Sequence, residues 1–245
     1  EGKLYAPKIC QNMFANMANL TSVNGTALDV SQTTDMQYMF LNCSKLQKVE
    51  ASSWNVGNVT SMFNMFRNCY KVSELDVSKW DMSNAIDVSL MFHSCYELQS
   101  IDVGNWTVGK LAVGKDINMG SMFEDCRALT TVNVSGWDTT NVKYISFMFK
   151  GCSNLESIDV SKWNVDNVTE MHSMFAGCVK LSSPMNLSGW KVNEVTSMAL
   201  MFSGCQSLPS IDVSGWNVSN AKSLRGVFKG CKLLTELAVA EWTVS

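Results

Sequence analysis

The sequence predicts an α/β repeat solenoid, a curved array of about nine coils that are 26 residues long. The first observation behind this prediction is that three residue types recur with this period along nearly the whole 245-residue chain. A fixed repeat of about 20 to 50 residues is typical of solenoid and related repeat proteins. The recurring residues are Trp54, Trp80, Trp106, Trp137, Trp163, Trp190, Trp216 and Trp242, the eight cysteines from Cys43 to Cys231, and Phe14, Phe40, Phe66, Phe92, Phe123, Phe149, Phe175, Phe202 and Phe228.

Each coil also divides into two segments of different period. The segment before each tryptophan alternates apolar and polar residues, as in residues 74–78, which predicts a short strand with one buried face. The segment after it has apolar residues three or four apart, as at Val59, Met62, Phe66 and Cys69, which predicts a short helix. We therefore expect parallel strands on the concave face and helices on the convex face. The expected helix N-caps are Asn58, Asn84, Asn141, Asn167 and Asn220.

The first coil departs from the repeat. Met17 stands where later coils have cysteine, and Leu28 stands where they have tryptophan. Atypical terminal repeats cap many solenoids, so residues 1–35 are predicted to form a degenerate capping coil. Residues 36–245 are predicted to form the regular array within the same continuous domain. The array stops within a repeat at Trp242–Ser245, so we expect the chain to be a fragment of a longer protein.

Two irregularities interrupt the regular array. Five extra residues lie within residues 108–116, between Trp106 and Cys126, and predict a glycine-rich loop at one edge of the solenoid. One extra residue near Ser183 and Pro184 predicts a bulge. Because long irregular loops often carry function, the first is a competing candidate for a binding site.

Composition excludes several classes of partner. The hydrophobic fraction of 46% is sufficient for a continuous core. The net charge is −3 without any basic cluster, so nucleic-acid binding is not expected. No apolar run reaches the roughly 18 residues of a membrane span, so no membrane insertion is expected within this chain. The oligomeric state is not predicted.

The nine cysteines are interpreted as buried free thiols. Eight occupy one position per coil, and Cys10 occupies the position of core methionines such as Met36. Equivalent positions of adjacent coils should not meet the roughly 5.5 Å Cα separation of a disulfide. Disulfides stacked along the array and a metal site are the weaker alternatives.

The coil resembles the leucine-rich repeat, with tryptophan where that frame usually has Asn or Cys. More specifically, residues 148–168 and 201–221 are similar to the 26-residue repeat of BspA-like bacterial surface proteins. This resemblance implies a secreted or wall-anchored, non-catalytic protein that acts in adhesion. It supplies no catalytic or binding residues that could be transferred to this chain.

The outward positions of the predicted strands are the candidate ligand-binding residues. They form a ladder of acidic and amide side chains spaced about 4.8 Å apart, which suits a basic patch on a protein ligand. A solvated face whose side chains bond to their own backbone is the alternative, and a bound cation such as calcium is another. The residues are Glu50, Asp76, Asp102, Asn133, Asp159, Asn186 and Asp212.

Catalysis is not predicted, and neither are a cofactor or a metal. His93 and His172 do not recur and fall at polar positions, so both are expected to be exposed. The predicted function is cell-surface or extracellular adhesion through a protein ligand of a host or neighbouring cell. The alternatives are a passive spacer that projects another domain and, less favoured, a glycan-binding surface made of exposed tryptophans. We expect the tryptophans to be buried in the core instead, because burying one removes roughly 150–250 Å² from water.

Overall fold

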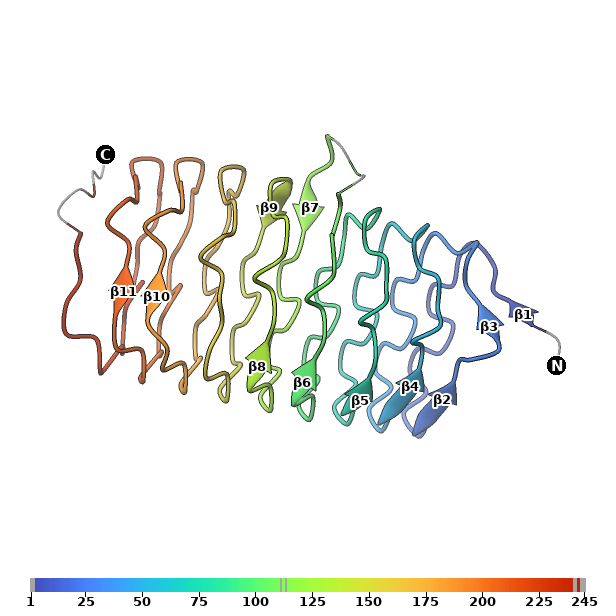
Figure 1. Cartoon of the computed structure of the whole chain (residues 1–245). Helices are drawn as coiled ribbons and strands as arrows, with labels where there is room; N and C mark the ends of the chain where they lie inside the picture. The colour runs from blue at the N-terminus through green and yellow to red at the C-terminus, as the bar shows by residue number, and fades with distance from the viewer. Residues whose placement is uncertain (1–2, 111, 113, 240–241, 243–245) are drawn as a thin grey trace.

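The computed structural model describes residues 3–110, 112, 114–239 and 242. Figure 1 shows an elongated stack of coils with the two termini at opposite ends. The predicted truncation within a repeat falls partly on residues 243–245, which lie outside the described residues. The division into a capping coil and a regular array stays a prediction. Within the described part of the chain, no helix is long and apolar enough to cross a membrane.

The predicted strands are confirmed as one set of short parallel strands. They pair in register between successive coils, for example Val23 with Val49 and Met185 with Ile211. We call the surface that these strands form the strand face; in Figure 1 most of its arrows lie in the lower part of the view, and those of β10 and β11 lie at mid-height. The three sheets are β2 (Ser22–Asn24), β4 (Lys48–Glu50) and β5 (Glu74–Leu75); β6 (Ser100–Ile101) and β8 (Thr131–Val132); and β10 (Met185–Asn186) and β11 (Ile211–Asp212).

A second parallel ladder runs along another side of the array. Its eight rungs join nine residues from Ile9 to Ser223, one rung for each turn of the array. Most rungs are isolated bridges, such as that between Asp35 and Ser61. The paired strands on this side are β7 (Ile117–Asn118) with β9 (Val142–Tyr144), while β1 (Leu4–Tyr5) pairs with β3 (Leu28–Asp29) at the N-terminal end.

The predicted helices are wrong, since no described residue is helical. In the segments after the tryptophans, alternate N–H groups donate to the following coil, and others close turns three residues long, as from Met65 to Met62. In the segment after Trp54, the N–H groups of Met62 and Phe66 donate to the carbonyls of Asp87 and Met91, at 2.9 and 2.8 Å. In an α-helix these N–H groups would donate to carbonyls of the same segment, four residues earlier. The fold is therefore a parallel β-solenoid without the expected helical layer.

Left-handed backbone positions explain why an apolar spacing of three or four does not produce a helix here. Asn64 and Asn68 have φ of 57° and 62°, and two such residues within one segment bend the chain at corners that no right-handed helix contains. Four coils place glycine at the second of these corners, where φ is positive. Those glycines are Gly151, Gly177, Gly204 and Gly230.

The predicted helix caps serve a different purpose. The side-chain amide of Asn58 donates to the carbonyl of Ser31 in the preceding coil at 2.7 Å, and Asn84 donates to Gly57 in the same way. Asn167 and Asn220 repeat this bond at 2.7 Å. These asparagines therefore bond neighbouring coils together, and none of them caps a helix.

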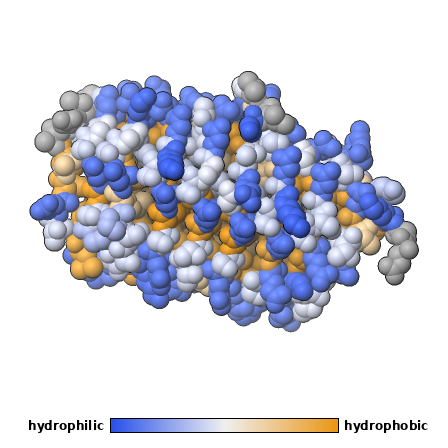
Figure 2. All heavy atoms as spheres, in the orientation of Figure 1, coloured by the Kyte–Doolittle hydropathy of each residue, from blue (hydrophilic) through white to orange (hydrophobic). Residues whose placement is uncertain are grey.

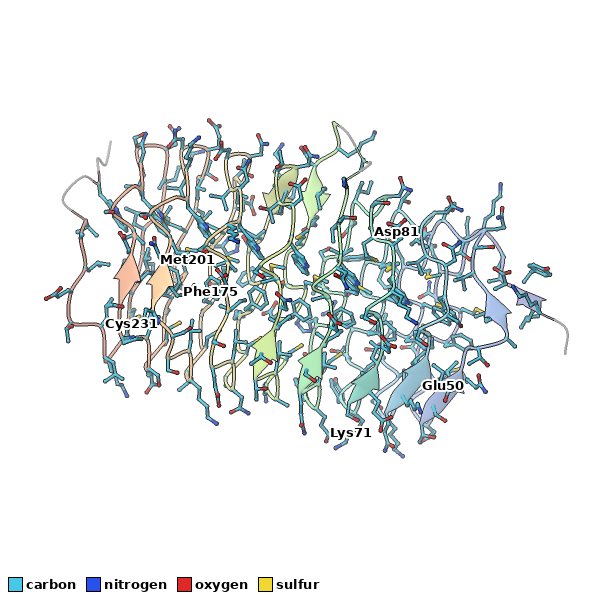
Figure 3. The ribbon with its side chains drawn as sticks, viewed as in Figure 1. Glu50, Lys71, Asp81, Phe175, Met201 and Cys231 are labelled. Carbon is cyan, nitrogen blue, oxygen red and sulfur yellow. The ribbon has the colours of Figure 1, made fainter. Side chains whose placement is uncertain are left out.

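The core consists of columns of identical residues that run the length of the array. The Phe rings from Phe14 to Phe228 stack with centroids 5.1–5.8 Å apart. In Figure 3, Phe175 and Met201 lie within the stack of coils, whereas Glu50 and Lys71 lie at its lower edge. Because each coil rests on nearly identical neighbours, the period in the sequence becomes continuity of the core.

All nine cysteines are free, and all but the half-buried Cys231 are buried. Each thiol of the repeated column donates to a phenylalanine carbonyl of the preceding coil, as from Cys69 to Phe40 at 3.1 Å. Burial raises the pKa of the Cys126 and Cys152 thiols well above the ordinary range. The prediction of buried free thiols is confirmed for eight of the nine.

Native protein should therefore react with a thiol reagent only at Cys231, and slowly, because thiolate is the reactive species. Unfolded protein should react at all nine positions. Mass spectrometry after labelling measures both numbers, and Cys231→Ala is the control that should remove the native signal. Rapid native labelling of several cysteines, or a mass deficit from disulfides, would contradict this expectation.

Candidate binding surface

The seven predicted ligand-binding residues all lie on the strand face, where they point away from the core. Asp76 and Asp102 are exposed, whereas Glu50 and Asp212 are half-buried. Inward neighbours such as Val49 are buried, as the alternation predicts. We call these seven residues the Asp ladder. Figure 2 shows rows of hydrophilic side chains across the viewed side of the array, with hydrophobic side chains between them.

Side chains of the Asp ladder also accept hydrogen bonds from the backbone two residues later in the chain. The Oδ1 atom of Asp76 accepts hydrogen bonds from the N–H and the hydroxyl of Ser78, at 3.1 and 2.7 Å. Such Asx turns explain why either Asp or Asn can stand at this position, since both side chains supply the acceptor oxygen. The same turn joins Asp102 to Gly104, Asn133 to Ser135, Asp159 to Ser161, Asn186 to Ser188 and Asp212 to Ser214.

These turns lower the pKa of three carboxyl groups of the ladder. Hydrogen bonds from the serine hydroxyl and N–H lower the pKa of Asp76 and of Asp159. The N–H and hydroxyl of Ser214 lower the pKa of Asp212. A carboxyl group with a lowered pKa stabilises the fold above its unfolded pKa, and that contribution disappears as pH falls through the folded pKa. At neutral pH all three are carboxylates.

The N-terminal half of the strand face is hollowed. A hollow of about 670 Å³ is lined by β4, β5 and β6 and includes three members of the ladder, Glu50, Asp76 and Asp102. Glu74 adds a fourth carboxylate, and the ammonium of Lys48 is the one positive group in the lining, so the net charge is −3. Lys48 lies 3.4 Å from Glu50 and 3.8 Å from Glu74. The two aspartates have no such partner among the described residues.

A second hollow, of about 520 Å³, lies farther along the strand face. Its lining contains Asn133, Asp159 and Asn186, so it carries one charge instead of several. Pro184 and Met185 contribute apolar surface there. The structure thus divides the predicted ladder into an acidic half, with three of its carboxylates in one hollow, and a less charged half, in which Asn133 and Asn186 alternate with Asp159 and Asp212. The acidic half is the stronger candidate for a basic ligand.

The tryptophans do not form a carbohydrate platform. Trp54, Trp80, Trp106, Trp137, Trp163, Trp190 and Trp216 are buried, and only Trp242 in the last coil is half-buried. Their rings cover one another, as between Trp137 and Trp163 at 5.9 Å. Each indole N–H from Trp54 to Trp216 donates to a carbonyl of the preceding coil, for example from Trp106 to Val77 at 2.9 Å. The glycan hypothesis is overturned because no buried ring face is open to a sugar.

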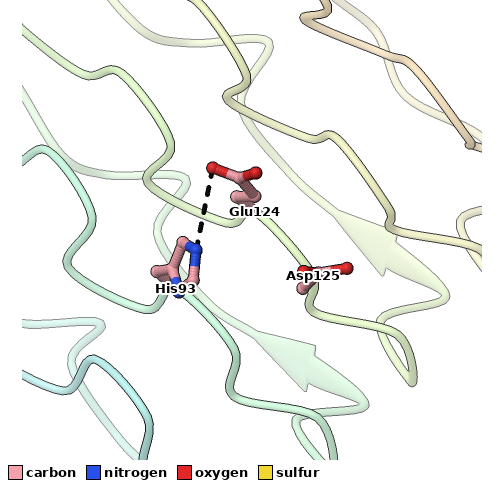
Figure 4. Close-up of side chains that lie close together, drawn as sticks. All are labelled: His93, Glu124 and Asp125. Atoms are coloured by element: carbon pink, nitrogen blue, oxygen red, sulfur yellow. Dashed lines mark ion pairs between the residues drawn. The ribbon is translucent and has the colours of Figure 1, made fainter.

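The prediction that both histidines are exposed is wrong. His93 is half-buried, with its Nε2 atom 3.7 Å from a carboxylate oxygen of Glu124 (Figure 4). Burial lowers the pKa of His93, although Glu124 opposes this effect. His172 is also half-buried, packs edge-on against Phe147 at 4.4 Å and bonds to Ser146.

His93, Glu124 and Asp125 are the one described group whose ligand atoms are close enough for a metal ion. Two cations already occupy its carboxylates. Lys150 lies 2.8 Å from Glu124, and Arg127 lies 3.6 Å from Asp125. A divalent ion would have to displace both, so this group is better described as an ion-pair network between coils than as a metal centre.

The described residues of the loop at 108–116 lie at the upper edge in Figure 1. Leu111 and Val113 lie outside the described residues. Gly109 has φ of 69°, and Asp116 is bonded to Lys143 at 2.8 Å. This ion pair ties the end of the loop to the following coil.

Sequence reasoning placed the ladder on one face but missed the hollow and its charge imbalance. Lys48 and Glu74 are visible in the sequence as the residues two positions before Glu50 and Asp76. Residues two apart on a strand lie on the same face of the sheet. This spacing was the available signal that Lys48 and Glu74 lie beside the ladder. The depth of the surface depends on how successive coils are offset, which no single repeat specifies.

Comparisons with known proteins identify a family but no activity. Residues 8–118 and residues 117–242 each match a family described as "Mycoplasma protein of unknown function, DUF285". No curated protein matches the chain. Among solved structures, it is similar to the "Crystal structure of TLR13-ssRNA13 complex", with 15% identity and a TM-score of 0.43. That similarity covers 87% of this chain and 32% of the other, so this chain spans about one third of that protein's length.

Proposed function

This chain belongs to the DUF285 family, and we propose that it is a non-catalytic scaffold that binds a basic segment of a protein ligand. The observation that carries this proposal is the acidic hollow formed by Glu50, Glu74, Asp76 and Asp102 on the strand face. A continuous face of stacked strands is the surface with which many solenoids recognise partners. A basic ligand would replace repulsion among the four carboxylates with attraction, so charge favours binding there.

The resemblance to BspA-like surface proteins extends this proposal to adhesion. In that form, the chain is secreted or displayed at a bacterial cell surface and binds a protein of a host or neighbouring cell. The motif in residues 148–168 supports this extension, and residues 201–221 repeat it with small changes.

A short oligolysine peptide is a suitable probe for the acidic hollow. We expect it to bind the parent chain with an affinity that falls as salt increases, because added ions screen charges beyond about 8 Å at physiological ionic strength. The double variant Asp76→Asn and Asp102→Asn should weaken binding about tenfold at low salt. Fluorescence anisotropy of a labelled peptide at two salt concentrations measures both effects.

Asparagine is the appropriate substitution because the ladder already contains it. Asn133 accepts the N–H of Ser135 at 3.3 Å, so the Asx turn survives loss of the charge. The matched control is Asp159→Asn with Asp212→Asn, which removes the same charge outside the acidic hollow. Equal weakening by both double variants would show that net charge alone attracts the peptide, and would refute the hollow as the site.

The passive spacer and the loop at residues 108–116 are separated by the same assay. Deleting five residues from the loop should leave peptide binding unchanged if the acidic hollow is the site. Lost binding with the loop deletion, together with full binding by Asp76→Asn and Asp102→Asn, would move the site to the loop. If the parent chain does not bind the peptide at low salt, the spacer becomes the better description.

A further inference from the structure

The side of the array that carries the second parallel ladder has large and small side chains in alternate coils. The alternating position lies three residues after each rung of that ladder, as Leu90 lies after Asp87. Tyr, Leu, Phe and Leu stand there in every second coil, and Asn or Ser stands in the coils between them. In chain order the residues are Tyr38, Asn64, Leu90, Ser121, Phe147, Ser173 and Leu200.

The backbone at this position does not explain the large side chains. The residues Tyr38, Leu90, Phe147 and Leu200 have φ of 59°, 55°, 60° and 59°. Bulky residues rarely adopt this left-handed region, whereas Asn and Gly adopt it readily. Asn64 has the same conformation, with φ of 57°. The four large residues therefore oppose the local preference of the chain, so the reason for them lies in what their side chains contact.

The large side chains form ridges across this side of the array. Tyr38 leans over the next coil and packs edge-on against Phe63 at 5.2 Å, and Phe147 packs in the same way against His172 at 4.4 Å. All four large residues stay half-buried, whereas the small residues between them are buried. The ridges recur every two coils, which is about 9.6 Å at a coil spacing of about 4.8 Å. We call this surface the ridge face.

A hollow of about 430 Å³ separates two of the ridges. Its lining includes Phe147 and His172 from one ridge, Leu200 from the next, and the small residues Ser173 and Ala199 between them. The ridge face thus carries apolar projections and recesses with one common spacing. A partner that fills successive recesses needs projections about 9.6 Å apart, and the ridge face itself has that spacing.

We propose that the ridge face binds a second copy of this chain, with the two arrays antiparallel and the ridges of each copy in the grooves of the other. Burial of the exposed parts of the ridge side chains drives the association. A two-fold axis parallel to the ridges relates the copies, so the interface is isologous and closes as a dimer. A two-fold axis along the array would instead set each ridge against the same ridge of the other copy.

Polar side chains beside the ridges favour one register. In it, the ridge of Tyr38 and Phe63 lies over the hollow beside Leu200. Because the coils of the two copies run in opposite directions, every carboxylate among the rungs of the second ladder then faces a hydroxyl of the other copy. The facing pairs are Asp35 with Ser197, Asp87 with Tyr144, and Glu170 with Ser61. A hydroxyl donates to a carboxylate, so these pairs support the contact.

Registers displaced by one ridge bring like charges together. One places Asp87 against Asp87 of the other copy, and the other places Lys150 against Lys150, which costs binding energy in both cases. In the favoured register Asn118 lies at the two-fold axis and faces itself. Glu124 also faces itself there, but it is buried and lies 2.8 Å from Lys150.

Cysteine cross-linking tests the register. The native thiols do not interfere, since eight are buried and Cys231→Ala removes the ninth. In that background, Asn118→Cys should cross-link to its own copy through a short bis-maleimide. Ser61→Cys and Glu170→Cys should cross-link only when the two variants are mixed. Asn133→Cys, on the exposed strand face, is the control that should stay uncross-linked.

Sedimentation velocity over a concentration series tests the ridges. Tyr38→Asn together with Phe147→Ser places at two ridges the residue types that the intervening coils already have, so the fold should persist, as circular dichroism would show. Each changed side chain occurs twice in a two-fold interface, so the dissociation constant of the dimer should rise about 100-fold. Tyr70→Asn with Tyr96→Ser removes two half-buried, stacked rings outside the ridge face and should leave the constant unchanged.

The proposal is overturned if the parent chain sediments as a monomer at every concentration tested. It is also overturned if the ridge variant and the Tyr70 and Tyr96 control change the dissociation constant by the same factor. Cross-linking of Ser61→Cys alone, as efficient as in the mixture with Glu170→Cys, would contradict the antiparallel register. The cross-linking result does not depend on whether the ridge variant folds.

Discussion

Replacing Trp163 by alanine is expected to lower the free energy of unfolding by about 3–5 kcal/mol, the range for emptying a large aromatic site in a core. Trp163 is 3% exposed, stacks on Trp137 at 5.9 Å and donates its indole N–H to Val134 at 3.0 Å. Because each coil is stabilised by its neighbours, the cavity should also reduce the cooperativity of unfolding. A urea titration measures both effects when it is monitored by circular dichroism of the backbone, which does not depend on the tryptophan signal.

Two substitutions serve as controls for Trp163→Ala. Trp163→Phe keeps a stacked ring but loses volume and the N–H donor, so it should cost about 1–2 kcal/mol. Trp242→Ala should cost less than half as much as Trp163→Ala, because Trp242 is half-buried and its Nε1 atom has no hydrogen-bond partner among the described residues. An unchanged unfolding midpoint for Trp163→Ala would contradict the core role assigned to the tryptophan column.

Alkaline pH is expected to unfold the array. Burial raises the folded-state pKa of all nine cysteine thiols, and it does so most for six of them, to about 12 for Cys205. The others are Cys69, Cys95, Cys126, Cys152 and Cys178. In the unfolded chain a thiol ionises near pH 8.5, so above that pH the unfolded state loses protons that the native state keeps. The stabilisation is complete below about pH 8.5 and is lost as pH rises towards the folded pKa values.

The expected slope is steep because six thiols act together. Each contributes about 1.4 kcal/mol per pH unit, so the six lower the free energy of unfolding by about 8 kcal/mol per unit above about pH 9. Most domains are stable by only about 5–15 kcal/mol, so the array should unfold within about two pH units. Urea titrations at pH 7.5, 9 and 10 with a reductant present measure the slope.

Cys152→Ala is the matched test of this mechanism. It should reduce the alkaline slope by about 1.4 kcal/mol per pH unit, even though it costs about 1–2 kcal/mol at pH 7.5. Cys231→Ala should have a smaller effect on the slope, because that thiol is only half-buried. A slope that is the same in the parent chain and in Cys152→Ala would exclude thiol ionisation as the cause.

The sequence alone determined the repeat, its register and which residues face the core. Equivalent residues of adjacent coils stack on each other, so an apolar residue that recurs at one position has the same buried surroundings in every coil. For this reason the burial of Trp163 and Cys152 and the outward direction of Asp76 could be predicted from spacing alone. A strand of period two also leaves little choice about which side is buried.

Only the tertiary structure decided the path of the chain after each tryptophan. Apolar residues three or four apart suit a helix, but they suit equally a chain that turns at two left-handed corners, as at Asn64 and Asn68. The choice depends on where the N–H groups of Met62 and Phe66 find acceptors. Their acceptors are Asp87 and Met91, 25 residues later in the sequence, and become available only when the next coil has stacked. The local sequence contains no information about an acceptor in another coil. The helix prediction therefore failed where the backbone hydrogen bonds run between coils.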